Sequence, residues 1–266
     1  MIEQVLTRIF ASQWQVLIYS AIALLAATEI GYRLGSRLHR TNDEARRQQV
    51  GSIQGAILGL LALLLGFTFA MAAARYENRR VLVLDEANAI GTTYLRAKLL
   101  GEDHQQKIEQ LLRRYVDARL DFYGAGADLD KLDAAEKATA QFQHELWSHA
   151  AAAAMEAPTP ITATFITTLN EAIDLDASRV NALRSHVPGA VWLLLLIVAF
   201  CGCYACGYAA GASGVRGQFG SVILPLLIAV VIALIADLDR PREGFIGISQ
   251  QPMSDLQEAL DVESSR

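Results

Sequence analysis

The chain has 266 residues, of which 53% are hydrophobic and 19% are charged, with a formal net charge of −5 and a pI near 5.6. A soluble chain of this length is rarely so apolar unless its apolar residues are segregated, and here they are. The acidic balance gives no reason to expect a nucleic-acid partner. All three cysteines, Cys201, Cys203 and Cys206, lie close together, so no disulfide is expected in the polar part of the chain.

Four stretches without formal charge, apart from His186, predict membrane spans. Each is long enough to cross a hydrocarbon layer of ~30 Å as a helix. The first should stay in the mature protein, because its apolar run continues past the only A-x-A motif. The stretches are Ile9–Thr28, Gln48–Ala74, Ser185–Val215 and Gly217–Ala236.

We therefore predict an all-α membrane protein in which two transmembrane helical hairpins flank a helical extramembrane domain. The first hairpin covers residues 1–74, with spans at about 14–34 and 50–74. The extramembrane domain covers 75–187, and the second hairpin covers 188–240, with spans at about 188–210 and 218–238. Residues 241–266 are expected to form a polar C-terminal tail.

Helical periodicity runs through the polar segment. One face of the segment after the second span repeats Val81, Leu84, Asn88, Leu95 and Leu99, which predicts that this span leaves the membrane as a rod reaching about Leu100. Further helices are expected at about 102–123, from about 130 and from about 161. Asp133-x-x-Glu136 resembles a capping box for the second of these.

Signatures of catalysis are absent from the sequence: there is no G-x-S-x-G, no P-loop and no H-E-x-x-H. We therefore expect no enzyme, no cofactor and no metal. The spacing Cys201-x-Cys203-x-x-Cys206 puts two thiols on one helical face, but small cysteines inside an apolar helix are more often packing residues.

The second span carries a stripe of small residues that indicates close helix packing. Gly51, Gly55 and Gly59 form a double G-x-x-x-G, and Gly66 continues the stripe. The partner is open at this stage: either the first or third span of the same chain, or further copies around a central axis.

A neighbouring face of the second span is polar at one end and apolar through its middle. Such a face can line a narrow pore with a hydrophobic constriction, or it can face lipid. Its residues are Gln54, Leu58, Leu61, Leu65 and Phe69. On the fourth span, Ile228 is expected to face lipid.

Charged residues near the ends of the spans are the candidate functional groups. Glu29 and Arg33 are one turn apart and are expected to form a buried ion pair. In a ring of identical subunits, acids at a pore mouth would concentrate cations, although Arg240 or Arg242 could instead neutralise a neighbouring aspartate. The candidates are Glu77, Asp237 and Asp239, followed by Asp85 and Glu86.

Two motifs carry a resemblance to a known family. The run from Arg79 to Arg96, RRVLVLDEANAIGTTYLR, and the run from Leu234 to Gly244 with Ser249-Gln250 resemble a bacterial membrane family often labelled bestrophin-like. Bestrophins are pentameric ion channels whose second span lines the pore, so the resemblance implies a homo-pentamer with that layout. Phe67 and Phe69 are similar to the aromatic residues of the bestrophin neck.

Three functional classes follow. The favoured one is a homo-oligomeric channel for cations, sodium among them, in a bacterial inner membrane, with lipid, inorganic ions and its own copies as partners. The alternatives are a stator-type proton channel subunit and a non-conducting scaffold or stress sensor. The arginines leave open which side of the membrane holds the helical domain, since Arg37 and Arg47 flank one end of the second span and Arg75 and Arg79 the other.

Overall fold

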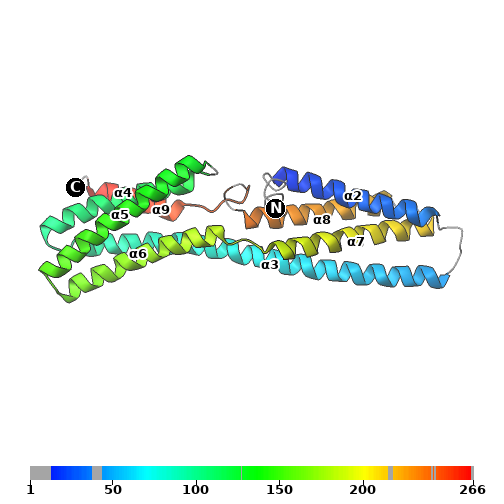
Figure 1. The fold of residues 1–266 in the computed structure, drawn as a ribbon, viewed down its shortest axis with the longest axis horizontal. Helices are drawn as coiled ribbons and strands as arrows, with labels where there is room; N and C mark the ends of the chain where they lie inside the picture. Colours follow the sequence, from blue (N-terminus) through cyan, green and yellow to red (C-terminus); the bar gives the residue numbers. More distant parts are fainter. Residues whose placement is uncertain are drawn as a thin grey trace. The chain divides into compact units, whose positions relative to one another are not determined.

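The computed structural model describes residues 13–37, 44–126, 128–214, 218–240, 242 and 244–264, and these contain helices and no strand. The ends of the charge-free stretches at 9–12, 215 and 217 lie outside them. The all-α prediction is confirmed. The helices are α2 (Gln13–Arg37), α3 (Glu44–Ala97), α4 (Glu102–Gly124), α5 (Leu129–Glu156), α6 (Pro160–Arg184), α7 (Gly189–Ser213), α8 (Gln218–Asp239) and α9 (Gln251–Ser264) (Figure 1).

The chain divides into two compact units. Met1–Tyr76 and His186–Ile246 form the first, which we call the membrane unit. Glu77–Ser185 and Gly247–Arg266 form the second, which we call the helical unit. The long helix α3 contributes to both.

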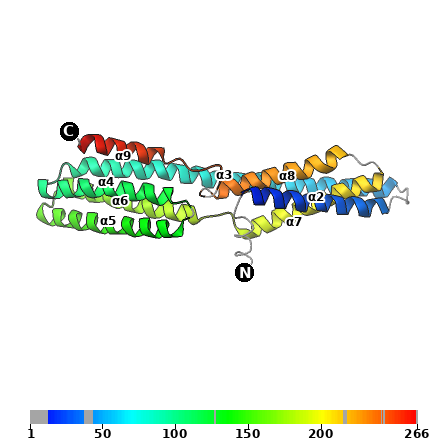
Figure 2. The same cartoon turned by 90° about the horizontal axis from the view of Figure 1, so that it is seen from above.

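Four segments are long and apolar enough to cross a membrane, which confirms the predicted number of spans. They are Trp14–Arg37, Gln48–Ala97, Pro160–Ser213 and Ser221–Asp239. The third includes α6 and α7, and its charge-free part is α7. In the membrane unit, α2 lies beside both α7 and α8 (Figures 1 and 2).

The helices α2 and α7 touch backbone to backbone through glycines outside the predicted glycine stripe. Gly31-x-x-x-Gly35 on α2 faces Gly207-x-x-x-Gly211 on α7. An added Cβ at Gly207 would lie 1.9 Å from the carbonyl oxygen of Thr28, and one at Gly31 would lie 2.2 Å from that of Tyr204. No side chain fits at these positions, so the two G-x-x-x-G motifs set the distance between the helices.

The core of the membrane unit contains side chains from α2, α3, α7 and α8. Leu24, Leu61, Leu195 and Ile232 are all buried there. Ile228 belongs to the same cluster, so the expectation that it faces lipid is wrong.

The core of the helical unit combines α4, α5, α6 and α9 with the second half of α3. Leu112, Leu146 and Phe165 are fully enclosed in it. The helix α5 begins one turn earlier than the predicted capping box, because the Asp128 carboxylate accepts hydrogen bonds from the backbone N–H groups of Asp130 and Lys131.

The C-terminal residues are not a free tail. Residues 251–264 form α9, whose Met253 and Leu260 are buried in the core of the helical unit. Its Gln257 side chain donates to Asp117 on α4 at 2.6 Å. The spacing of these apolar residues at seven is helical, but the surrounding acidic and polar residues concealed it in the sequence.

Helix α3 is continuous from Glu44 to Ala97, close to the predicted end near Leu100. In the helical unit, its inward face carries Val83, Ala87, Ile90 and Tyr94, all buried. The predicted apolar stripe lies on another face: Val81, Leu84, Leu95 and Leu99 are 45–64% exposed. The rod therefore has two apolar faces, of which this chain covers one.

Candidate functional site

Most of the predicted pore-lining face is packed inside the membrane unit. Leu61 is 2% exposed, and Leu58 and Leu65 pack against the same core. Leu58 and Leu61 would contact a Cβ built at Gly202 of α7, at 3.4 and 3.6 Å. A side chain enclosed by its own chain cannot face a pore, so this assignment is corrected for Leu61, whereas Leu58 and Leu65 are only partly buried. The periodicity identified a face, but it could not distinguish a core face from a pore face.

The two ends of that predicted face differ from its middle. Gln54 is half-buried and donates a hydrogen bond from Nε2 to the Sγ of Cys206 at 3.3 Å. Phe69 is exposed. Cys203, the middle residue of the cysteine motif, is buried in the core of the membrane unit, where a packing residue is expected.

The glycine stripe of α3 is open. At Gly51, Gly55, Gly59 and Gly66, a Cβ would meet no described atom of another element within 4 Å. Packing of this stripe against the described parts of α2 and α7, one of the two alternatives left by the sequence, is therefore not observed. Leu63 and Phe67 are exposed on the same helix.

Glu29 and Arg33 form the predicted pair, with Arg33 Nε donating to Glu29 Oε1 at 2.7 Å. The pair is not buried within the chain, because both side chains are exposed on α2. Its i, i+4 spacing is sufficient to explain the contact.

Asp237 and Asp239, at the end of α8, are buried, and their carboxylates accept hydrogen bonds from backbone N–H groups. The carboxylate of Asp237 accepts hydrogen bonds from the N–H groups of Phe245 at 2.9 Å and Ile246 at 3.1 Å. The carboxylate of Asp239 accepts from the N–H of Val187, at 2.9 and 3.2 Å to its two oxygens. These contacts fix the segments that precede α7 and follow α8, and they support a positioning role for both acids.

Arg79 also holds backbone groups through its side chain, at the C-terminal end of α6 within the helical unit. Its Nε donates to the carbonyl of Ala182 at 2.9 Å and its Nη2 to that of Ser185 at 2.6 Å. The last carbonyls of a helix lack partners inside it, so a buried guanidinium there satisfies groups that water cannot reach.

Glu77 and Asp85 are the candidate acids that remain accessible. Glu77 has a side chain 55% exposed and lies 3.6 Å from Arg80 in a loose surface pair. Asp85 is exposed on α3.

Glu86 is fully buried at the centre of an ionic cluster. Its Oε1 accepts from Nε of Arg119 at 2.7 Å, and its Oε2 accepts from Nη1 of Arg179. Asp176 pairs with the other side of Arg119. Two carboxylates and two guanidiniums thus balance one another away from water, as a buried charge requires.

Polar side chains complete this cluster. Arg179 donates from Nη2 to Oε1 of Gln250, just before α9, at 2.6 Å, and its guanidinium lies 3.8 Å from the ring centroid of Tyr123. Gln143 donates to Oδ2 of Asp176 at 2.7 Å and to the hydroxyl of Tyr115 at 3.3 Å. The cluster therefore ties α3, α4, α5, α6 and the start of α9 together.

Electrostatics within the cluster are set by burial and by opposite charges. Burial alone would lower the pKa of Arg119, but the interactions with Glu86, Tyr115, Tyr123 and Asp176 together outweigh it, and the pKa of Arg119 is raised. Burial raises the pKa of Tyr115, and the charge of Glu86 adds to this, so its hydroxyl keeps its proton. Burial also raises the pKa of Asp176 above the ordinary 3.8, although the charge of Arg119 opposes it.

Asp176 gives a prediction for the pH dependence of stability. A carboxyl whose pKa is higher in the folded than in the unfolded state binds a proton more readily when folded. Its stabilising contribution is therefore complete below 3.8 and is lost as pH rises through the folded pKa. Asp176→Asn should remove this part of the slope in thermal unfolding scans from pH 4 upward. Asp174→Asn, at an exposed acid of the same helix, is the control, and equal slopes in both variants would contradict the assignment.

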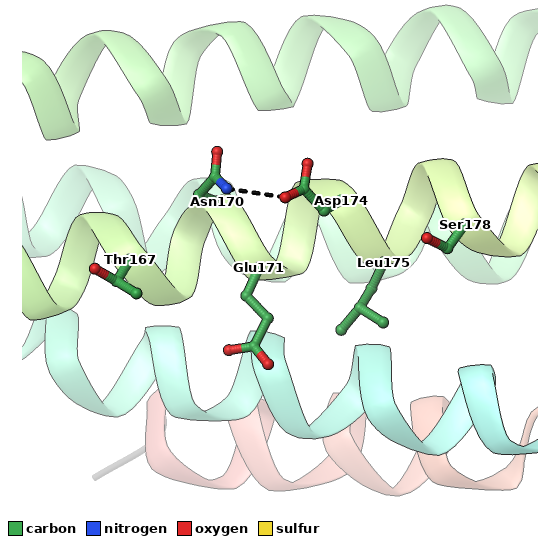
Figure 3. A pocket seen from close by; sticks show the side chains of 6 residues that line it. All are labelled: Thr167, Asn170, Glu171, Asp174, Leu175 and Ser178. Carbon is green, nitrogen blue, oxygen red and sulfur yellow. Dashed lines mark hydrogen bonds between the residues drawn. The ribbon is translucent and has the colours of Figure 1, made fainter.

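A surface hollow of about 400 Å³ lies along α6 (Figure 3). Its lining residues all come from this one helix: Thr167, Asn170, Glu171, Asp174, Leu175 and Ser178. Asn170 donates to Asp174 at 2.9 Å, one turn along. Among the described residues no second element contributes to the lining, so this feature is a polar helix face and not an enclosed site.

The buried cluster was missed although the sequence contains a signal for it. Glu86 lies among Val83, Ala87 and Ile90 on the inward apolar face of α3. Arg119 lies likewise among the buried residues of α4. A single charge on an otherwise apolar helical face predicts a buried, paired charge, but its partners come from other helices and cannot be read from spacing.

A family model described as Bestrophin-like domain matches residues 18–253. No curated protein matches the chain. Among solved structures, two variants of a bacterial bestrophin homologue from Klebsiella pneumoniae are similar. The first has a TM-score of 0.71 and 16% identity over 94% of this chain and 98% of that one. The second has a TM-score of 0.69 and 14% identity over 94% and 99%.

A further crystal structure, described as a membrane protein, has a TM-score of 0.68 and 15% identity over 94% of this chain and 99% of its own. At these identities the structural likeness shows the fold. The family match covers nearly the whole chain, including the motif residues Arg79, Glu86, Asp237, Asp239 and Gln250, whose contacts are described above.

Proposed function

This chain belongs to the bestrophin-like family, and from that membership we propose that it is a homo-oligomeric ion channel whose conduit is lined by α3. The observation that carries the proposal is the open face of this helix. A membrane span with exposed Gly51, Gly55, Gly59 and Gly66 can approach another copy of itself closely, because little side chain intervenes. Five copies and a bacterial inner membrane are proposed from the resemblance.

The constriction is proposed on the exposed side of α3 instead of the packed leucines. Leu63 and Phe67 are the most exposed of its large apolar residues near the glycine stripe, where Ile53 and Leu60 are exposed as well, and Phe69 remains from the original set. Apolar side chains around a narrow pore can gate it by excluding water.

Cation selectivity, with sodium as the expected ion, is proposed to depend on Glu77, with Asp85 as a second contributor. Both carboxylates are exposed on α3, whereas Asp237, Asp239 and Glu86 are buried in contacts that hold the fold. Within ~8 Å of an ion path, at physiological ionic strength, the field of such a carboxylate is only partly screened.

Reversal potentials in planar bilayers test this proposal. The purified protein should conduct. Under a salt gradient, its reversal potential should lie closer to the equilibrium potential of the cation than to that of the anion. Glu77→Gln should move the potential towards zero, because each subunit loses one charge at the mouth. Glu171→Gln, at an exposed acid on α6, should leave it unchanged. An anion-selective wild type would refute cation selectivity, and absence of current would favour the scaffold or sensor.

Assembly gives an independent prediction. Gly59→Leu should reduce the oligomer to a minor fraction in native mass spectrometry, because a leucine on the open stripe separates neighbouring helices. Val230→Leu adds bulk at an exposed position of α8 and should leave assembly intact. Equal oligomer content in Gly59→Leu and wild type would remove the stripe from the subunit contact.

A further inference from the structure

An exposed aromatic pair lies at one end of the membrane unit, where the start of α2 lies beside the end of α8 (Figures 1 and 2). The rings of Trp14, on α2, and Phe245, which follows α8, meet edge to face with their centroids 5.6 Å apart. Despite this contact Trp14 is 59% exposed and Phe245 is 73% exposed. Adjoining apolar side chains of this size, left uncovered by their own chain, indicate a contact surface.

Phe245 is held at the level where α8 reaches the edge of the membrane. The span Ser221–Asp239 has 19 residues, which is roughly 28 Å of helix and close to the thickness of a hydrocarbon layer. Asp237, in its last turn, therefore lies near one edge of the hydrocarbon. The buried Asp237 carboxylate accepts hydrogen bonds from the N–H groups of Phe245 and Ile246, so the chain after α8 turns back to this edge.

Exposed apolar side chains lead along both spans to this pair. On α2, Ile18 and Ile22 follow Trp14 at intervals of four residues on one helical face, and they are 50% and 60% exposed. On α8, Leu227 and Leu234 lie two turns apart and are 58% and 40% exposed. Acyl chains of lipid cover such faces of a spanning helix. The aromatic pair thus lies where two lipid-facing surfaces end.

We infer that Trp14 and Phe245 form a lipid-binding site at the membrane–water interface, where the glycerol and ester groups of phospholipids meet the acyl chains. An indole has an apolar body and one N–H donor, and this layer offers it acyl chains on one side and ester carbonyls on the other. Phe245 adds apolar surface towards the acyl chains.

The pair fixes the depth at which two spans lie in the bilayer, because α2 begins and α8 ends beside it. Asp237 is a positioning residue for this site, since it holds the backbone that carries the Phe245 ring. The inference requires only the membrane spans, so it does not depend on ion conduction or on the number of copies.

Fluorescence quenching in phosphatidylcholine liposomes measures the depth of Trp14 in the full chain. The chain has three tryptophans, so Trp147→Phe with Trp192→Phe leaves Trp14 as the reporter. The lipids carry bromine atoms either near the ester end of the acyl chains or near their methyl end. Bromines near the ester end should quench Trp14 about twofold more than those near the methyl end.

The matched control keeps Trp147 as the reporter, with Trp14→Phe and Trp192→Phe. Trp147 lies in the helical unit and is 43% exposed. Aqueous iodide should quench Trp147 more strongly than Trp14, and neither brominated lipid should quench Trp147.

A second reporter replaces the other ring of the pair. With all three native tryptophans changed to phenylalanine, Phe245→Trp should give the depth measured for Trp14, since the two rings are in contact. Adding Asp237→Asn puts an amide group, which cannot accept a hydrogen bond, in place of one carboxylate oxygen. The preference of the reporter at 245 for bromines near the ester end should then fall, and its quenching by iodide should rise.

Each other result overturns a stated part of the inference. Strong quenching of both reporters by iodide, without quenching by brominated lipid, would place the pair in water. Quenching by neither agent would mean that another protein surface, such as a second copy, covers the pair. Stronger quenching by bromines near the methyl end would place it inside the hydrocarbon. An unchanged depth profile in Asp237→Asn would refute the positioning role of Asp237.

Discussion

Glu86→Gln should lower the stability of the helical unit by about 3–5 kcal/mol, the cost of removing one partner from a buried ion pair. The variant keeps the shape of the side chain but leaves Arg119 and Arg179 with Asp176 as their remaining counter-charge. Desolvated guanidiniums cannot recover this loss from water. Melting followed by Trp147 fluorescence, with Trp14 and Trp192 replaced by phenylalanine, reports on the helical unit alone.

An exposed ion pair in the same unit is the matched control. On α5, Lys137 Nζ lies 2.6 Å from Asp133 Oδ2, and both side chains are well exposed. Asp133→Asn should cost less than about 1 kcal/mol, because water solvates the lysine that is left. If the melting temperatures of Glu86→Gln and Asp133→Asn fell by the same amount, the central role of the buried cluster would be wrong.

Gly207→Ala should disrupt the membrane unit with the loss of about 3 kcal/mol or more, the upper range for overpacking a core. The added methyl would lie 1.9 Å from the carbonyl oxygen of Thr28. That neighbour is backbone, so no rotamer change can relieve the clash, and α2 and α7 must separate. The measurement is the fraction of protein that survives heating in detergent, followed by size-exclusion chromatography.

Gly189→Ala is the control in the same helix. It is the first residue of α7, and no described atom of another element lies within 4 Å of its added Cβ. Its survival curve should match that of the wild type. A wild-type curve for Gly207→Ala as well would show that the contact between α2 and α7 is looser than described.

The spans were predictable because absence of charge over a helix length is a local property that hydrocarbon demands. The contacts between the spans could not be predicted from the sequence. The glycines of the second span form the more conspicuous motif in the sequence, yet among the described residues the glycines whose added Cβ would meet backbone are Gly31, Gly35, Gly207 and Gly211. A small residue permits close approach, but the sequence does not say which helix approaches.

The charged residues show the same limit. The i, i+4 pair Glu29–Arg33 was predictable, because both members lie one turn apart on one helix. The roles of Glu86, Asp237 and Asp239 were not, because their partners lie on other elements or eight and more residues away. An exposed carboxylate can attract ions, whereas a buried one binds backbone N–H groups or guanidiniums. Whether a carboxylate is buried depends on the tertiary structure and cannot be read from the local sequence.

The continuity of α3 also constrains how this protein can change in evolution. Each residue inserted into or deleted from the helix between Ala87 and Ile90 would turn everything beyond it by about 100° relative to the inward residues Val83 and Ala87. Ile90 and Tyr94, now inward, would then trade faces with residues that point outward. Length changes should therefore be tolerated in the connections between helices and be rare within this stretch, where insertions of about seven, eleven or eighteen residues come closest to restoring the phase.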